Sequence, residues 1–349
     1  MSINIVLHVG TEKTGSTSIQ HTLYDNRKAL KEMGYLMPLT LGYPCHIHLT
    51  ACALESEPTH SIRSLLKLTD QDDFRAFREK TLADLKAEIS GSDYHTLLIT
   101  DEHVNFHLVK PGLIEAFKEA LDSVGDVCKV ILYLRRQDEL RMSLYSEAVK
   151  AGNLTSFDPD NPIVPFKIIP NRFNYLRVLN RLSETFGLEA ITPRVFRRDE
   201  FVGGDVILDY LSVVGISADL IDRSSIQSNP SLDAKAIWAM SKITKCLKES
   251  GRSESEGIRQ HMLARVQKAF QGKGPKMRAS FHHDFLSRFE SMNEEIKEIY
   301  FSDRNAPLFK SIEQDKADEE SKYYPECSYS VQELTEELTR RESENYGIS

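Results

Sequence analysis

Short apolar runs alternate with segments of helical periodicity along most of the chain. The first run, at residues 3–9, precedes a polar loop, after which apolar residues recur at helical spacing from Ile19 to Met33. The run at 127–134 is almost continuously apolar, which is typical of a strand covered on both faces of a parallel sheet. The expected strands are residues 3–9, 35–37, 96–100, 127–134 and 190–196, and the expected helices are 19–33, 74–89, 138–150, 172–186 and 205–214.

This alternation predicts a doubly wound α/β fold, with a mainly parallel sheet flanked by helices. Residues 225–300 have a mostly helical pattern, and we expect them to extend one domain that covers residues 1–310. The segment 153–171 contains four prolines and little periodicity, so it is expected to be a surface loop. Residues 311–349 have the polar, acidic composition of a solvated tail.

The charge balance restricts the classes of ligand. The chain has 349 residues, with 44 Lys and Arg against 52 Asp and Glu, and a formal net charge of −8. Nucleic-acid binding depends on a basic surface, so no nucleic-acid partner is expected. The start of the chain does not resemble a signal peptide, no apolar run is long enough to cross a bilayer, and the five cysteines form no CxxC pair. These features favour a cytoplasmic protein with reduced thiols and no transmembrane segment.

The polar loop after the first strand has the composition of an anion site. Its sequence is Gly10-Thr11-Glu12-Lys13-Thr14-Gly15-Ser16-Thr17-Ser18. A glycine-rich turn between a strand and a helix directs backbone N–H groups to one point, and the helix N-terminus adds partial positive charge. Gly10 and Gly15 have the spacing of the nucleotide P-loop, but Ser16 replaces the lysine of that pattern. The alternative is a tight turn that carries polar residues by chance.

A second anion motif follows the strand at 127–134. Arg135 ends this strand, and Ser143 lies eight residues later in the expected helix. Ligands of open α/β sheets bind at the carboxyl ends of the strands, where a guanidinium can bind phosphate with two hydrogen bonds. The alternative is an ordinary surface ion pair of Arg135 with Asp138 or Glu139.

Together the two motifs resemble the cofactor site of sulfotransferases that use 3'-phosphoadenosine-5'-phosphosulfate (PAPS). Their 5'-phosphosulfate loop, particularly in the bacterial sulfotransferase-family proteins, is similar to the stretch His8-Val9-Gly10-Thr11-Glu12-Lys13-Thr14-Gly15-Ser16-Thr17-Ser18-Ile19-Gln20. Arg135 and Ser143 match the arginine and serine that bind the 3'-phosphate in that family. The resemblance covers about residues 3–310. The RKGxxGDWK segment of the small-molecule branch is not found in this sequence, which argues against steroid and phenol acceptors.

The resemblance implies transfer of a sulfuryl group from PAPS to a hydroxyl acceptor, with adenosine 3',5'-diphosphate as the product and no required metal. By extrapolation from the bacterial members, the acceptor is expected to be a carbohydrate, with a lipid, a small metabolite or a peptide tyrosine as the alternatives. Residues 225–300 are expected to shape the acceptor side of the site. Lys13 is expected to stabilise the leaving diphosphate. The expected cofactor-binding residues are Lys13, Thr14, Gly15, Ser16, Thr17, Ser18, Arg135 and Ser143. An ATP-dependent P-loop kinase and a non-catalytic nucleotide-binding protein of the same fold are the alternatives.

The acceptor hydroxyl needs a base, and the end of the strand at 96–100 provides two candidates. Glu102 and His103 follow this strand, and Glu102 is preferred because related bacterial sequences often have glutamate there. The alternative is that Glu102 only begins a helix and His103 is a packed histidine.

His46 and His48 are expected to line the acceptor pocket. In an alternative reading, they form a zinc site with Cys45, completed by His103 or His107.

Overall fold

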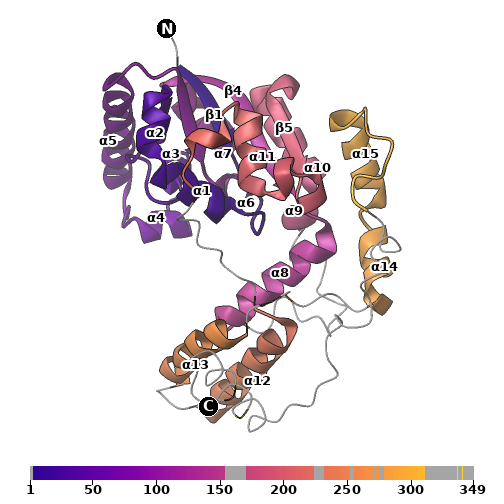
Figure 1. Ribbon diagram of the computed structural model, residues 1–349. Helices are drawn as coiled ribbons and strands as arrows, with labels where there is room; N and C mark the ends of the chain where they lie inside the picture. The colour runs from indigo at the N-terminus through magenta and orange to yellow at the C-terminus, as the bar shows by residue number, and fades with distance from the viewer. Residues whose placement is uncertain are drawn as a thin grey trace. The chain divides into compact units, whose positions relative to one another are not determined.

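The computed structural model describes residues 3–153, 170–223, 232–251, 255–270, 272, 274, 279–310, 336 and 340. Contacts within the chain divide it into two compact units (Figure 1). The first unit comprises Met1–Arg135, Asn174–Gln227 and Glu298–Ser302. The second comprises Arg136–Phe173, Ser228–Lys297 and Asp303–Ser349. The predicted tail at 311–349 lies almost entirely outside the described residues, as does most of the predicted loop at 153–171.

The first unit contains a parallel sheet of five strands in the order β2-β3-β1-β4-β5. The strands are β1 (Ile3–His8), β2 (Tyr35–Leu36), β3 (Thr96–Thr100), β4 (Gly125–Leu134) and β5 (Ile191–Val195). All of them overlap the segments that were predicted to be strands, and the predicted doubly wound α/β fold is confirmed. Since β1 lies between β3 and β4, the segments that follow these three strands emerge at neighbouring places on one edge of the sheet.

Helices cover both faces of this sheet. The main helices of the first unit are α1 (Ser16–Asp25), α2 (Arg27–Glu32), α3 (Ile47–Cys52), α4 (Ser61–Leu65), α5 (Gln71–Ser90), α6 (His103–His107), α7 (Leu113–Asp122), α10 (Tyr175–Phe186) and α11 (Val206–Val214). One face of the sheet packs against α1, α2 and α11 through a cluster that includes Val6, Ile19 and Leu211. The residues that alternate with Val6 along β1, Ile5 and Leu7, are fully buried as well. Burial of both faces explains why β3 and β4 end in continuous apolar runs.

The predicted helix at 19–33 is two helices, because the chain bends at Asn26. The Asn26 side chain donates hydrogen bonds to the carbonyls of Thr22 and Asp222 and accepts one from the Asp222 backbone N–H. Asp222 is 196 residues away in the sequence, so the contact that accompanies the bend is tertiary and has no local signal.

The second unit is helical, in agreement with the predicted helical C-terminal region. Its helices are α8 (Gln137–Lys150), α9 (Pro170–Phe173), α12 (Ala234–Ser250), α13 (Ser255–Ala269), α14 (Ala279–Ser287) and most of α15 (Glu290–Tyr300). Helices α12 and α14 pack against α8, and α13 packs against α12. Phe173, Phe285 and Phe289 form an aromatic cluster with ring centroids 5.2–6.0 Å apart.

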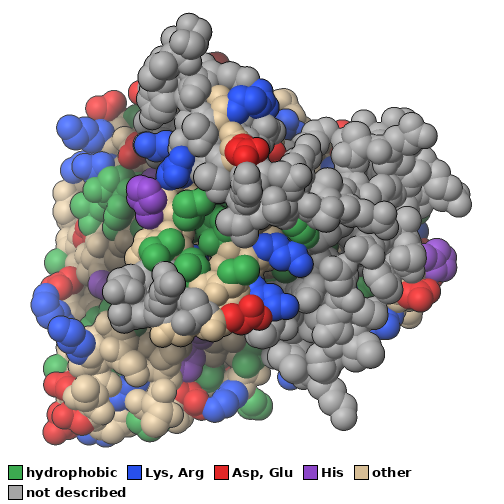
Figure 2. Space-filling view, turned by 90° about the horizontal axis from the view of Figure 1, so that it is seen from below, with side chains coloured by type: hydrophobic (Ala, Val, Ile, Leu, Met, Phe, Trp, Pro, Cys, Tyr) green, Lys and Arg blue, Asp and Glu red, His purple; other side chains and the backbone are tan. Residues whose placement is uncertain are grey.

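Two further questions raised by the sequence concern the charge of the surface and helices that could cross a membrane. On the face that Figure 2 shows, both basic and acidic side chains are present on the coloured surface. Within the described ranges, none of the helices combines the length and the apolar character that crossing a membrane requires.

Candidate functional site

The loop between β1 and α1 has the backbone shape of an anion-binding turn. Gly10, Lys13 and Gly15 have positive φ angles of 35°, 65° and 78°. Gly15 is the N-cap of α1 and supplies no side-chain cap, so the first N–H groups of this 10-residue helix are not capped by that residue. A Cβ atom on Gly15 would lie 3.0 Å from the Val206 side chain, which together with the positive φ explains the glycine. The open helix N-terminus is suited to an anionic group.

Hydrogen bonds from neighbouring elements hold this loop in place. The Thr11 hydroxyl donates to the Tyr133 carbonyl of β4 at 2.5 Å. The Asn105 side chain in α6 donates to the carbonyls of Val9 and Gly10 at 2.8 and 2.5 Å. Within the loop, the buried Thr14 hydroxyl donates to the Thr11 carbonyl. These bonds fix the backbone on which Lys13 and the N–H groups are carried.

Arg135 joins the second anion motif to this loop. Its Nη1 donates a hydrogen bond of 2.9 Å to the Lys13 carbonyl, and its guanidinium lies over the Phe196 ring at 5.4 Å from the centroid. The Tyr175 hydroxyl donates to the Arg135 carbonyl at 2.6 Å. The structure therefore brings Arg135 and the Lys13 backbone together. Ser143 is a half-buried residue of α8 and belongs to the second unit.

The two acidic residues considered as partners of Arg135 both form ion pairs with Arg136. Arg136 Nε lies 2.8 Å from Asp138 Oδ1, and Arg136 Nη2 lies 3.6 Å from Glu139 Oε1. These contacts belong to the first turn of α8, where two acidic residues also favour the helix N-terminus.

Glu102 lies against the loop from the other neighbouring strand. Because His8 of β1 is in register with Thr100 of β3, the residue two positions after Thr100 falls beside the loop that follows β1. Glu102 Oε2 accepts a hydrogen bond of 2.5 Å from the Ser16 hydroxyl. A Cβ atom on Gly10 would lie 3.2 Å from Glu102 Cβ, so the two segments are in close contact. Glu102 is half-buried, and its carboxylate lies at the start of α1.

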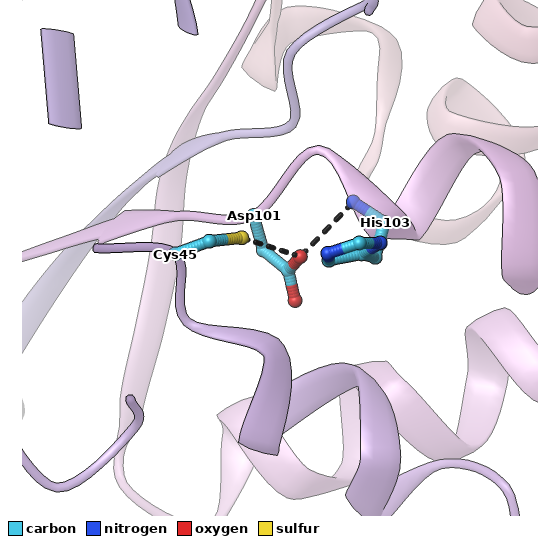
Figure 3. Close-up of side chains that lie close together, drawn as sticks. All are labelled: Cys45, Asp101 and His103. Atoms are coloured by element: carbon cyan, nitrogen blue, oxygen red, sulfur yellow. Dashed lines mark hydrogen bonds between the residues drawn. The ribbon is translucent and has the colours of Figure 1, made fainter. Parts of the chain in front are cut away.

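His103 belongs to a different group of side chains, which also contains Cys45 and Asp101 (Figure 3). Asp101 is fully buried and accepts hydrogen bonds from the Thr50 hydroxyl at 2.6 Å, the Cys45 thiol at 3.3 Å and the His103 backbone N–H at 3.0 Å. Burial raises the pKa of Asp101, and the nearby His103 opposes this rise. Burial also raises the pKa of the Cys45 thiol, and the negative charge of Asp101 adds to this shift.

The two histidines predicted to line an acceptor pocket have different surroundings. His46 is fully buried, and its Nδ1 accepts a hydrogen bond from the Thr100 backbone N–H, so it has no exposed surface to offer an acceptor. His48 is half-buried, its Nδ1 is 3.1 Å from the Thr40 carbonyl, and its ring packs edge-on against Phe77.

The zinc set considered from the sequence is not assembled as predicted. Of its members, Cys45 and His103 come together, whereas the Nδ1 atom of His107 lies 3.2 Å from His60 Nε2. The third member of the group is Asp101, which the sequence reasoning missed. The sequence feature that could have identified Asp101 is its position directly after a buried strand and next to Glu102.

Two buried histidines make the first unit sensitive to acid. Burial lowers the pKa of His8 to about 4 and that of His46 to about 3, from an ordinary value of 6.5. At pH values between the lowered pKa of each folded histidine and the ordinary value of 6.5, the unfolded chain binds more protons than the folded chain. The free energy of unfolding therefore falls as the pH is lowered through this range. From pH 7 to pH 5, the expected loss is about 2 kcal/mol for each histidine.

Chemical denaturation of the wild type and the His46→Asn variant at both pH values tests this expectation. The Asn side-chain oxygen can replace His46 Nδ1 as the acceptor for the Thr100 N–H, and comparison with the variant cancels the contributions of other groups. The loss between pH 7 and pH 5 should be smaller by about 2 kcal/mol in the variant. An equal loss in both proteins would show that His46 is not held neutral by the fold.

Comparisons with known proteins give two distant similarities. No protein-family model matches the chain. An uncharacterized protein of Archaeoglobus fulgidus is 29% identical over 183 residues, which are 51% of this chain and 47% of that protein. The chain therefore matches about half the length of this relative. Among solved structures, a sulfotransferase from Alicyclobacillus acidocaldarius aligns with a TM-score of 0.39 and 18% identity, over 66% of this chain and 87% of that chain.

Proposed function

We propose that the protein is a sulfotransferase that moves a sulfuryl group from PAPS to a hydroxyl acceptor. The observation that carries the proposal is the hydrogen bond between Arg135 and the Lys13 carbonyl. It joins two anion motifs that are 122 residues apart and that resemble the 3'-phosphate and 5'-phosphosulfate sites of one cofactor. A donor with phosphate groups on both its 3' and 5' sides requires two such cationic positions close together.

The 5' side of the donor is assigned to the start of α1. The backbone N–H groups of Thr14 to Thr17 and the helix dipole favour an anion there, and Lys13 adds a full positive charge. The hydroxyls of Thr14 and Ser16 already donate to Thr11 and Glu102, so these two residues contribute through their N–H groups. The hydroxyls of Thr17 and Ser18 complete the set. Arg135 is assigned to the 3'-phosphate.

The transfer step is an in-line displacement at sulfur. The acceptor oxygen forms a bond to sulfur while the bond from sulfur to the bridging phosphate oxygen breaks, and adenosine 3',5'-diphosphate leaves. Lys13 stabilises the negative charge that develops on the bridging oxygen. Glu102 accepts the proton of the acceptor hydroxyl, because its carboxylate already lies at the loop that carries Lys13. The sulfate of the donor has a single negative charge, so these residues suffice without a metal for this step.

The acceptor is assigned to the carbohydrates, and this part of the proposal comes from the resemblance to bacterial sulfotransferase-family proteins. A cytoplasmic location accords with the four cysteines of the described ranges, which are all free thiols.

Calorimetric titration without magnesium tests the cofactor class. Adenosine 3',5'-diphosphate is expected to bind tightly, whereas adenosine 5'-monophosphate and ATP bind weakly, because only the first ligand uses both Arg135 and the loop. Preference for ATP, or binding of none of the three, would remove the proposal. Adding Mg²⁺ to the ATP titration tests the kinase alternative, which Ser16 disfavours because it stands where P-loop kinases have their phosphate-binding lysine.

Arg135→Ala should weaken binding of adenosine 3',5'-diphosphate by about 2–3 kcal/mol, or roughly 30- to 150-fold, because a charge-assisted contact to the 3'-phosphate is lost. Arg136→Ala is the matched control, since the Arg136 guanidinium pairs with Asp138. Arg135 also donates a hydrogen bond to the loop, and a loosened loop would weaken the binding of adenosine 5'-monophosphate and adenosine 3',5'-diphosphate equally. Titration with adenosine 5'-monophosphate therefore separates this effect from loss of the contact to the 3'-phosphate. Equal affinity of the wild type for ligands with and without the 3'-phosphate would remove this assignment.

A further inference from the structure

Three potential metal ligands gather beside the loop, and none of them is needed for the transfer step if Glu102 is the base. The thiol of Cys45, the carboxylate of Asp101 and the imidazole of His103 each present a ligand atom, and these atoms all lie within 4.8 Å of one another. Figure 3 shows the Cys45 sulfur and the His103 ring on opposite sides of the Asp101 carboxylate. We infer that Cys45, Asp101 and His103 bind one divalent transition-metal ion, for which Zn²⁺ is the best match.

The fold holds these ligands in place through the backbone. The His46 N–H donates to the Thr100 carbonyl at 3.0 Å, and the Thr100 N–H donates to His46 Nδ1 at 3.1 Å. This pair of hydrogen bonds holds Cys45, the residue before His46, opposite Asp101, the residue after Thr100. The His103 N–H then donates to the Asp101 carboxylate and fixes the start of α6. The ligands are therefore carried on a rigid part of the fold, as metal sites require.

The ligand types select the metal. Thiolate and imidazole are preferred by zinc and by related transition metals, whereas magnesium and calcium prefer oxygen ligands only. Bond lengths of about 2.0–2.3 Å to zinc place tetrahedral ligand atoms roughly 3.3–3.7 Å apart. Ligand atoms within 4.8 Å reach this arrangement by small side-chain rotations, without movement of the backbone.

The surroundings of Asp101 supply the outer hydrogen bonds that such a site needs. The Thr50 hydroxyl donates to one carboxylate oxygen at 2.6 Å, and the other oxygen accepts from the Cys45 thiol and the His103 N–H. When the metal binds, the thiol loses its proton to water and the ion takes the place of that proton. The two negative charges of the thiolate and the carboxylate then balance a divalent cation in a buried place.

The exposure of the ligands indicates an open coordination position. Asp101 is fully buried, but Cys45 and His103 are half-buried, so the ion can enter from their side. Three protein ligands with a fourth position for water or a small ligand are the usual arrangement of reactive zinc sites. This assignment gives His103 a ligand role and leaves Glu102 as the base of the proposed transfer.

Cobalt titration of the full chain tests the site. The reduced protein is stripped with a chelator and titrated with Co²⁺ while its absorption spectrum is recorded. One equivalent should produce a thiolate-to-cobalt charge-transfer band, which is absent in Cys45→Ser and retained in Cys246→Ser, a control at an exposed cysteine of α12. No band in the wild type, or a band that persists in Cys45→Ser, overturns the inference.

Competition with a chromophoric chelator measures the affinity for Zn²⁺. His103→Gln should weaken binding by more than about 100-fold, and Thr50→Val, which removes only an outer hydrogen bond, by about 10- to 100-fold. His103 is half-buried, so its replacement leaves the core intact, and circular dichroism verifies the fold. A loss of less than tenfold in His103→Gln overturns the inference. Binding of adenosine 3',5'-diphosphate to the metal-free protein is measured in parallel, so that failure of the metal site and failure of the sulfotransferase proposal are distinguished.

Discussion

Glu102→Gln should lower turnover by about 10²- to 10⁴-fold, the usual range for loss of a general base, with little change in the affinity for adenosine 3',5'-diphosphate. The Gln side-chain oxygen can still accept the hydrogen bond from the Ser16 hydroxyl, so the loop keeps its support. The substitution therefore removes the basic group alone. Single-turnover rates with PAPS and a hydroxyl acceptor, together with calorimetric affinities, measure the two effects separately.

The neighbouring His103→Gln variant decides between the two candidate bases. If Glu102 is the base, the metal-free His103→Gln protein should keep most of the turnover of the metal-free wild type. A large loss in His103→Gln, combined with nearly normal turnover in Glu102→Gln, would transfer the role of base to His103.

Lys13→Ala should lower turnover by about 10²- to 10³-fold, which is the cost of removing one donor that stabilises charge in the transition state. Lys13 has a φ angle of 65° and alanine also carries a Cβ atom, so the backbone strain is unchanged while the side chain beyond Cβ, with its ammonium group, is lost. Lys67→Ala is a matched control, because Lys67 is an exposed lysine with a φ angle of 58° in the same unit.

Two further comparisons make the Lys13 experiment decisive. Lys13→Arg keeps the positive charge and should retain more turnover than Lys13→Ala, although its planar guanidinium differs in shape from an ammonium group. Turnover of Lys13→Ala equal to that of Lys67→Ala would show that the loop lysine does not stabilise the leaving group.

Local patterns were sufficient for most of the secondary structure. Most strands were predicted because they contain short apolar stretches, whereas β5 alternates buried and half-buried residues. The loop from Gly10 to Ser18 was found because its glycines and hydroxyl residues are close together in the sequence. Helix α7 was missed although its buried residues recur at helical spacing from Leu113 to Leu121, so the pattern was available. The break at Asn26 was not predictable locally, since it involves a contact with Asp222.

The candidate site shows the same division between local and distant information. By itself the sequence determined the class of fold, the glycine- and hydroxyl-rich loop from Gly10 to Ser18 and the residue types that accompany it, because these depend on neighbours along the chain. The tertiary structure alone decided that Arg135 reaches the Lys13 carbonyl, that Glu102 meets Ser16, and that Asp101 joins Cys45 and His103. The physical reason is the strand order β2-β3-β1-β4-β5, which places the ends of β3 and β4 on either side of β1 and which hydrophobic periodicity does not specify.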